Sequence, residues 1–169
     1  MNEQIGAEAT ESKPIRVLSV EDNAADMRLI SELLGMSTLK TQVDFVRDGS
    51  EALDFLFQRG KYQDAPRPQL ILLDLTLPKV DGHEVLQTVK ESPDLKSIPV
   101  LILSGSRSRS DVNRSYTNHA NTYIVKPLDL DELTEVVHGI EQYWNRIAQL
   151  PYEDGPGSTP ERTKRKAKG

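Results

Sequence analysis

Five short apolar segments, each followed by a stretch with helical spacing, most constrain the fold of this chain. The segments are residues 15–20, 43–46, 70–73, 100–103 and 122–125. Most are rich in Val, Ile and Leu, which is typical of strands buried on both faces of a parallel sheet. Because parallel strands need crossover connections, the intervening stretches are predicted to be helices. The alternation therefore predicts an α/β fold with a doubly wound, five-stranded parallel sheet and five helices.

The fifth of these helices has the clearest pattern. Asp129 and Glu132 resemble a capping box at its start. Apolar residues then recur every three or four positions, at Leu133, Val136, Val137, Ile140, Trp144 and Ile147. The fourth helix is less regular, because its apolar positions Val112, Tyr116 and Ala120 follow a run rich in Ser and Arg.

The length of 169 residues suits one domain with short extensions. We expect residues 14–150 to form this domain, and residues 1–13 and 151–169 to be disordered, because few apolar residues occur in either extension. The formal net charge is −5, and the last 19 residues contribute five basic against three acidic side chains. The remaining part is therefore acidic, which argues against nucleic-acid binding by the folded domain.

Several classes of protein are excluded by what the sequence lacks. There is no cysteine, so disulfides and cysteine-ligated metal centres cannot form. The apolar segments are far shorter than the roughly 18 residues of a membrane span. Residues 1–12 carry three glutamates and no apolar core, unlike a secretion signal. We therefore expect a cytoplasmic protein without membrane contact.

Polar side chains follow four of the five apolar segments. Glu21 and Asp22 follow the first, Asp74 the third, Ser104 the fourth and Lys126 the fifth. Because the carboxyl ends of parallel strands meet at one edge of the sheet, these groups are predicted to form one site. Clustered carboxylates repel one another and suit Mg²⁺, which prefers oxygen ligands, while a hydroxyl and an ammonium suit a phosphoryl group. Asp74, directly after a buried strand, could also act as a nucleophile that forms an aspartyl phosphate.

Two prolines lie next to this predicted site. Pro78 restricts the loop after Asp74, and Gly82 ends a tight turn there. Pro127 directly follows Lys126, so the bond between them is a candidate for a cis peptide that would direct the ammonium inward.

At these residues the chain resembles the receiver domains of two-component response regulators. The likeness rests on Val-Glu-Asp-Asn at 20–23, Leu-Leu-Asp-Leu-Thr-Leu-Pro at 72–78, Asp81-Gly82, Ser104, and Tyr-Ile-Val-Lys-Pro at 123–127. It spans roughly residues 15–147. The resemblance implies a flavodoxin-like fold with strand order 2-1-3-4-5.

The resemblance also implies a role for each site residue. Asp74 would accept the phosphoryl group. The implied ligands of Mg²⁺ are the carboxylates of Glu21, Asp22 and Asp74 and the main-chain carbonyl of Thr76. Ser104 and Lys126 would contact the phosphoryl group and take part in signalling, and Tyr123 falls on the family's aromatic switch position.

Within the family, the chain looks most like the stand-alone regulators paired with bacterial and cyanobacterial phytochromes. The likeness lies in the loop at 60–69, the run at 91–96 and the ending at 139–144. It implies a sensor histidine kinase, of the phytochrome type, as phosphodonor.

The same likeness implies a homodimer formed through the fourth helix, fifth strand and fifth helix. Ile140, Tyr143 and Trp144 are the candidate interface residues. Tyr143 and Trp144 are adjacent on a helix and cannot both face the core, so one of them is expected to be exposed or covered by a partner.

Three other functions compete with this interpretation. A phosphohydrolase of the haloacid-dehalogenase type would use Asp74 as nucleophile, but it needs a second Asp where Thr76 stands. A flavodoxin-type cofactor binder needs a phosphate-binding loop after the first strand, where Glu21 and Asp22 would repel phosphate. A receiver that has lost phosphorylation would not be expected to keep the whole set of site residues. We therefore expect a phosphoacceptor rather than an enzyme, with at most self-catalysed aspartyl phosphorylation and dephosphorylation.

Overall fold

A computed structural model describes residues 13–35 and 41–151 of the chain. A parallel sheet of five strands has the order β2-β1-β3-β4-β5. The strands are β1 (Ile15–Val20), β2 (Thr41–Val46), β3 (Leu70–Leu73), β4 (Val100–Ser104) and β5 (Thr122–Val125). The predicted strand order is confirmed. The disorder predicted for residues 1–13 and 151–169 falls almost entirely outside the described residues.

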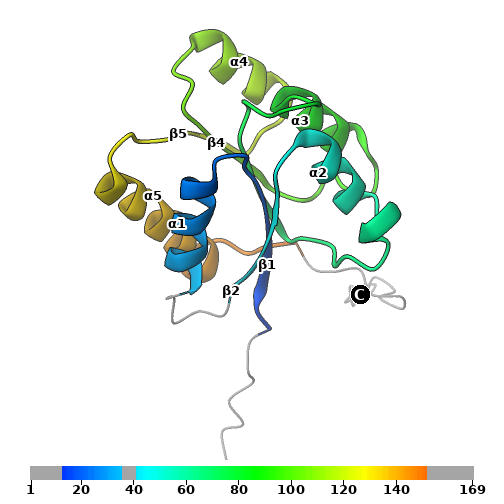
Figure 1. The fold of residues 1–169 in the computed structure, drawn as a ribbon, viewed down its shortest axis with the longest axis horizontal. Helices are drawn as coiled ribbons and strands as arrows, with labels where there is room; N and C mark the ends of the chain where they lie inside the picture. Colours follow the sequence, from blue (N-terminus) through cyan, green and yellow to red (C-terminus); the bar gives the residue numbers. More distant parts are fainter. Residues whose placement is uncertain (1–12, 36–40, 152–169) are drawn as a thin grey trace, which may run out of the picture.

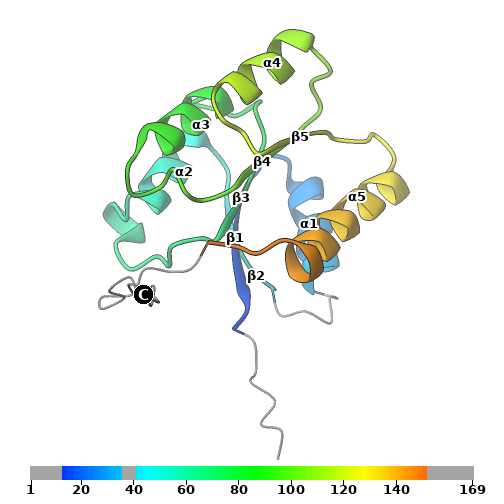
Figure 2. The same ribbon diagram turned by 180° about the vertical axis from the view of Figure 1, so that it is seen from behind.

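Helices cover both faces of the sheet, so the fold has three layers (Figures 1 and 2). They are α1 (Ala24–Gly35), α2 (Gly49–Leu56), α3 (Gly82–Glu91), α4 (Arg109–Thr117) and α5 (Leu130–Gln142). A 3₁₀ turn, η1 (Gly60–Tyr62), follows α2, and a π-helical turn, η2 (Tyr143–Ile147), follows α5. Helices α1 and α5 lie side by side on one face, and α2, α3 and α4 cover the other.

Alternation of side chains along the strands produces two separate cores. In β3, for example, Ile71 and Leu73 pack toward α2 and α3, whereas Leu70 and Leu72 pack toward α1 and α5. Every residue of β3 and β4 is buried, as expected for central strands, while β5 at the edge is only half-buried. The backbone that positions the acidic and polar residues at the ends of the central strands is therefore buried and excluded from water.

Side-chain caps fix where the helices begin. Asp48, Asp81, Ser108 and Asp129 cap α2, α3, α4 and α5, each accepting a hydrogen bond from a backbone N–H in the first turn. The predicted Asp129 cap is thereby confirmed.

The predicted ends of two helices need correction. Helix α4 ends at Thr117, so Ala120 lies beyond it. His119 takes a φ of +65°, and the N–H of Ala120 donates to the carbonyl of Ser115, which closes the helix. The regular part of α5 ends at Gln142, and the predicted final turn is π-helical.

Gly82 allows α3 to begin directly against the loop that follows β3. A Cβ atom at this position would lie 2.3 Å from the carbonyl oxygen of Asp74. The N–H of Gly82 also donates to the carbonyl of Leu75 at 3.0 Å. Only glycine fits this approach, so the start of α3 and the backbone around Asp74 are held as one unit.

Across the part of the chain that the structure describes, we find no helix with both the length and the apolar character that crossing a membrane would require.

Candidate functional site

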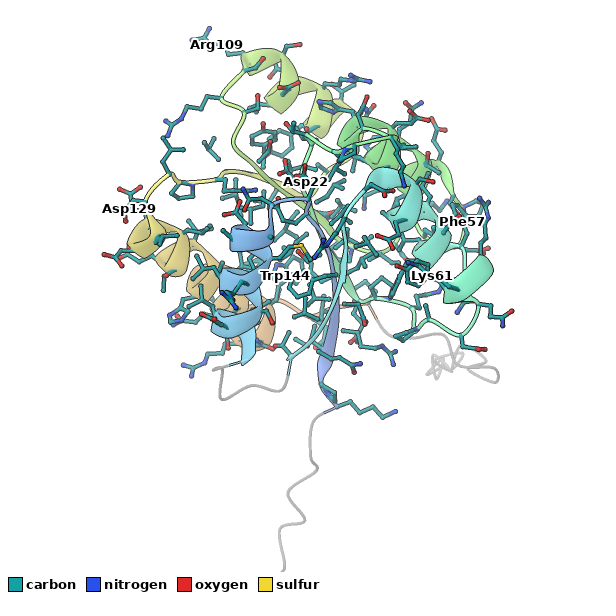
Figure 3. The ribbon with its side chains drawn as sticks, in the orientation of Figure 1. Asp22, Phe57, Lys61, Arg109, Asp129 and Trp144 are labelled. Carbon is teal, nitrogen blue, oxygen red and sulfur yellow. The ribbon has the colours of Figure 1, made fainter. Side chains whose placement is uncertain are left out.

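The structure brings the predicted polar residues together at the carboxyl edge of the sheet. Val20 is paired with Leu73, so Glu21 and Asp74, one residue further along, leave neighbouring strands at the same level. Asp22 lies next to Glu21, where β1 leads into α1 (Figure 3). Ser104 ends β4, and the N–H of Lys126 donates to its carbonyl at 2.7 Å.

Glu21, Asp22 and Asp74 form a compact acidic group. Each offers a carboxylate oxygen, and these oxygens all lie within 4.8 Å of one another. Glu21 and Asp74 are 3% and 7% exposed, whereas Asp22 is open to solvent. The group therefore combines two buried acids with one at the surface, an arrangement that suits a hard cation that keeps several waters.

Thr76 lies beside this group on the loop after β3. Its N–H donates to Asp74 Oδ1 at 3.1 Å, so the backbone at Thr76 is tied to the carboxylate that it follows. This contact orients Asp74 while leaving its second oxygen, Oδ2, for other partners.

Lys126 supplies the positive charge of the site. Its Nζ lies 2.5 Å from Glu21 Oε2, 3.0 Å from Asp26 Oδ2 and 3.1 Å from Asp74 Oδ2. Asp26, in the first turn of α1, was not among the residues predicted from the sequence. The available signal was its place in the first turn of the helix that directly follows Glu21 and Asp22, at the same edge of the sheet.

The charges of the site are unbalanced in favour of the acids. Four carboxylates, Glu21, Asp22, Asp26 and Asp74, surround one ammonium, which leaves a formal charge of −3 when all are ionised. Burial raises the pKa of Glu21, and the hydrogen bond from Lys126 only partly opposes this effect. Burial also disfavours the charged form of Lys126, but its contacts with Glu21 and Asp74 prevail and raise its pKa above the ordinary value. A divalent cation would offset most of the remaining negative charge, so the donor set fits Mg²⁺.

Ser104 and Tyr123 are joined through one residue of the β4–α4 loop. The Ser104 side chain is fully buried, and its Oγ accepts a hydrogen bond from the N–H of Ser106 at 3.3 Å. The Tyr123 hydroxyl donates to the carbonyl of Ser106 at 2.9 Å. The ring of Tyr123 is thus held against the loop that begins at Ser104.

The prediction of a cis bond before Pro127 is wrong. Within residues 13–35 and 41–151 no peptide bond is cis. The trans form is intrinsically favoured, and here Lys126 reaches the acids without the cis geometry. Its backbone continues the pairing between β5 and β4 by one residue, which already directs the side chain over the edge of the sheet.

The three candidate interface residues differ in exposure. Tyr143 is 50% exposed, whereas Trp144 packs against the core between the sheet, α1 and α5. This confirms the expected division between the two aromatic residues. Ile140 is 9% exposed in the same core, so it offers little accessible surface in the single chain.

Comparison with known proteins identifies the family. Residues 17–138 match the model of the response regulator receiver domain. The chain belongs to this family. Response regulator Rcp1 of Synechocystis sp. is 49% identical to it over 142 residues, which covers 83% of this chain and 97% of Rcp1. The probable methanogenesis regulatory protein FilR2 of Methanothrix harundinacea is 43% identical over 132 residues, covering 78% of this chain and 84% of FilR2.

Solved structures of receiver domains have the same fold. The phosphorylated cyanobacterial phytochrome response regulator RcpA matches with a TM-score of 0.81 and 49% identity, covering 83% of this chain and all of RcpA. The Mn²⁺-bound form of Rcp1 matches with a TM-score of 0.80 and 47% identity, covering 82% of this chain and all of that protein. The chain is thus a response regulator of the two-component type, related to phytochrome-associated regulators. Receiver domains in general are phosphoacceptors rather than enzymes, and they bind Mg²⁺ at an acidic pocket.

Proposed function

We propose that the receiver domain, residues 14–150, accepts a phosphoryl group on Asp74 from a sensor histidine kinase in a Mg²⁺-dependent reaction. The observation that carries this proposal is the position of the Asp74 carboxylate. It lies among the acids of a divalent-cation site and has its Oδ2 3.1 Å from the ammonium of Lys126. The names of RcpA and of similar bacteriophytochrome regulators support a kinase of the phytochrome type.

The metal would be held by the carboxylates of Glu21, Asp22 and Asp74 and by the main-chain carbonyl of Thr76. When bound, Mg²⁺ supplies positive charge that reduces the repulsion between Asp74 and the oxygens of an incoming phosphoryl group. The all-oxygen donor set and the excess of negative charge support this assignment.

The residues of the chain have separate parts in the transfer. An oxygen of Asp74 forms the new bond to phosphorus while the bond between phosphorus and the donor histidine nitrogen breaks. The Lys126 ammonium pairs with a phosphoryl oxygen and offsets its charge. Access is favoured by Gly105, because open space surrounds the position that a Cβ would occupy there.

The signal would leave through a change at the face formed by α4, β5 and α5. Once Asp74 carries a phosphoryl group, the Ser104 hydroxyl can donate to one of its oxygens and lose its contact with Ser106. Tyr123, which is half-buried against the core and bonded to the Ser106 carbonyl, would then change its packing against this loop, rather than turn inward from an exposed position. The face also carries exposed apolar side chains, such as Tyr116 and Leu130, which support a protein partner, including a second copy of the chain.

Intact-mass spectrometry after incubation with acetyl phosphate and Mg²⁺ tests the phosphoacceptor. The wild type should gain one phosphoryl mass, and Asp74→Asn should gain none, because the amide is a poor nucleophile. Asp94→Asn, an exposed aspartate in the loop after α3, is the matched control and should be labelled like the wild type. Labelling of Asp74→Asn at the wild-type level would exclude Asp74 as the acceptor.

Thermal unfolding with and without Mg²⁺ tests the metal site. Mg²⁺ should raise the melting temperature of the wild type, because it binds the folded chain, and should do little for Asp22→Ala. Equal shifts in both proteins would contradict the assignment.

Ser104→Ala tests the switch, since it should accept phosphate at Asp74 but lose most of the phosphate dependence of partner binding.

A further inference from the structure

The ammonium of Lys126 is shared by three carboxylates. Its Nζ lies 2.5 Å from Glu21 Oε2, 3.0 Å from Asp26 Oδ2 and 3.1 Å from Asp74 Oδ2. A lysine ammonium has three N–H donors, so one donor is directed to each acid. A phosphoryl oxygen that arrives at Asp74 therefore has to take a donor that one of these acids already holds.

Asp26 differs from the other two acids because it lies outside the group that suits the metal. Among the described residues, that group consists of Glu21, Asp22 and Asp74. The Asp26 side chain is 20% exposed and meets the site at the Lys126 ammonium. Its negative charge is thus added to the site without providing a ligand for the cation, and its effect on a phosphoryl group is exerted through Lys126.

The start of α1 holds Asp26 in this position. The Oδ1 atom of Asn23 accepts from the N–H groups of Ala25 at 2.9 Å and of Asp26 at 3.1 Å. The N–H of Asn23 in turn donates to Glu21 Oε1 at 3.0 Å. The backbone of Asp26 is therefore fixed relative to Glu21, so two of the three acids around Lys126 belong to one hydrogen-bonded unit.

Phosphorylation of Asp74 would change the three acids unequally. The carboxylate of Asp74 loses its charge when it becomes an acyl phosphate, so it then holds the Lys126 donor more weakly. Glu21 stays charged, but Mg²⁺ beside it would offset that charge. Asp26 keeps its charge and its hydrogen bond to the ammonium. Asp26 is therefore the acid that draws Lys126 toward α1 and away from the phosphoryl group.

We propose that Asp26 restrains Lys126, so that a phosphoryl group has to compete with this carboxylate for the ammonium. The inference rests on the proposed function, because it concerns the same transfer to Asp74. Asp26 is a positioning residue in this reaction, since it touches Lys126 rather than the reacting atoms. The restraint lowers the affinity of the site for phosphoryl groups and keeps its phosphorylation by small phosphodonors slow.

Removing the charge of Asp26 should strengthen the pairing of Lys126 with the phosphoryl group. In Asp26→Asn the amide oxygen can still accept from the ammonium, but as a neutral group. The difference between a charged and a neutral acceptor corresponds to about fivefold in an equilibrium. We expect Asp26→Asn to bind beryllium fluoride, a phosphoryl analogue, about fivefold more tightly than the wild type at saturating Mg²⁺. Phosphorylation by acetyl phosphate should become faster by about the same factor.

Opposite changes in two affinities separate this restraint from a merely structural role. The affinity of Asp26→Asn for Mg²⁺ alone should fall, because one negative charge near the cation is lost. Its affinity for beryllium fluoride should rise. A substitution that only loosened the site would weaken the binding of both.

Fluorine NMR titrations of the full chain with beryllium fluoride measure its affinity, and titration calorimetry measures the affinity for Mg²⁺. The fluorine that pairs with Lys126 is identified by its shift in Lys126→Arg, and its signal should also move in Asp26→Asn. Asp26→Glu restores the charge and should return the affinity toward the wild-type value. Glu32→Gln is the matched control, because it removes the same charge from an exposed position of α1, where Glu32 pairs with Arg28, and it should change neither affinity.

An Asp26→Asn protein that binds beryllium fluoride no more tightly than a phosphorylatable wild type would overturn the restraint alone. If Asp26→Asn does not fold, Asp26→Ser removes the same charge and gives the decision. A fivefold gain that persists in a Lys126→Met background would also overturn the restraint, because the effect would then not pass through Lys126. A wild type that gains no phosphoryl mass at Asp74 and binds no beryllium fluoride contradicts the proposed function, and the restraint falls with it.

Discussion

Removing the charge of Lys126 should destabilise the fold, because the buried acids of the site lose their positively charged partner. The side chain is 11% exposed and lies against Glu21 and Asp74, whose side chains are 4% and 9% exposed. Lys126→Met keeps the length of the side chain but leaves these acids without their ammonium. Removing one partner of a buried ion pair costs about 3–5 kcal/mol, and the solvent-exposed Asp22 side of the site favours the lower end, about 3 kcal/mol. For a domain of this size, that lowers the melting temperature by about 6–12 °C.

The stability that Lys126→Met loses should depend on pH in a defined direction. Burial already raises the pKa of Glu21 above its ordinary value of 4.5, and Lys126 opposes that rise. Without Lys126, the pKa of Glu21 rises further. A carboxyl group whose folded pKa is raised stabilises the fold at pH below its unfolded value, and this stabilisation is lost as the pH rises through the folded value. The destabilisation by Lys126→Met should therefore be smallest below pH 4.5 and grow as the pH rises toward neutrality.

Urea unfolding followed by circular dichroism, across this pH range and with or without Mg²⁺, measures both effects. Mg²⁺ should stabilise Lys126→Met more than the wild type, because the cation replaces the missing positive charge. Lys90→Met is the matched control, since Lys90 is also half-buried but donates to the carbonyls of Lys96 and Ile98 and to the Asn121 amide. The stability that Lys90→Met loses should not vary with pH in this range. Two results would refute the reasoning: a loss of stability in Lys126→Met that does not vary with pH, or equal stabilisation of Lys126→Met and the wild type by Mg²⁺.

Three further predictions concern other parts of the chain. Hydrogen bonds from Lys61 and Tyr62 lower the pKa of Glu51 to about 2. Glu51→Gln should therefore lower the free energy of unfolding by about 1–2 kcal/mol at pH 7, after solvent screening is taken into account. Urea unfolding should show this difference vanishing as the pH falls from 4.5 to 2. Gly82→Ala should destabilise by about 3 kcal/mol, whereas Gly→Ala at 139, where a Cβ meets open space, should be neutral or stabilising in the same assay. Tyr143→Glu should shift a dimer toward monomer in sedimentation without affecting phosphorylation, and a wild type that stays monomeric with and without phosphate would contradict the dimer.

The site could be predicted from the sequence because its main residues lie at the end of a strand or within two residues after it. Asp74 comes after four consecutive apolar residues, and the position of a strand end in a parallel sheet needs no knowledge of side-chain packing. Strand β3 is found at its predicted boundaries for the same reason. The local pattern is sufficient wherever burial on both faces leaves a continuous apolar run.

The remaining details depend on contacts between distant parts of the chain. Asp26 joins the site only because α1 brings its first turn over Lys126, a residue 100 positions away. The link from His83 to Asp111 likewise requires the packing of α3 beside α4, which neither helix specifies alone. Two other details needed no such contacts: the trans bond before Pro127 agrees with the intrinsic preference of peptide bonds, and the burial of Ile140 agrees with the apolar spacing of the fifth helix.

The order of the strands separates the site into a part that opens rarely and a part that can open locally. Strands β1 and β3 lie inside the sheet, paired on both sides, and they carry the acids Glu21, Asp22 and Asp74. Strand β5 is an edge strand and half-buried throughout, and it carries Tyr123. Amide hydrogens in central strands exchange with solvent only when most of the structure opens, whereas an edge strand can open locally. The acids that would hold the metal and accept the phosphoryl group thus follow the most protected strands, whereas the edge strand that carries Tyr123 and leads to Lys126 can open locally.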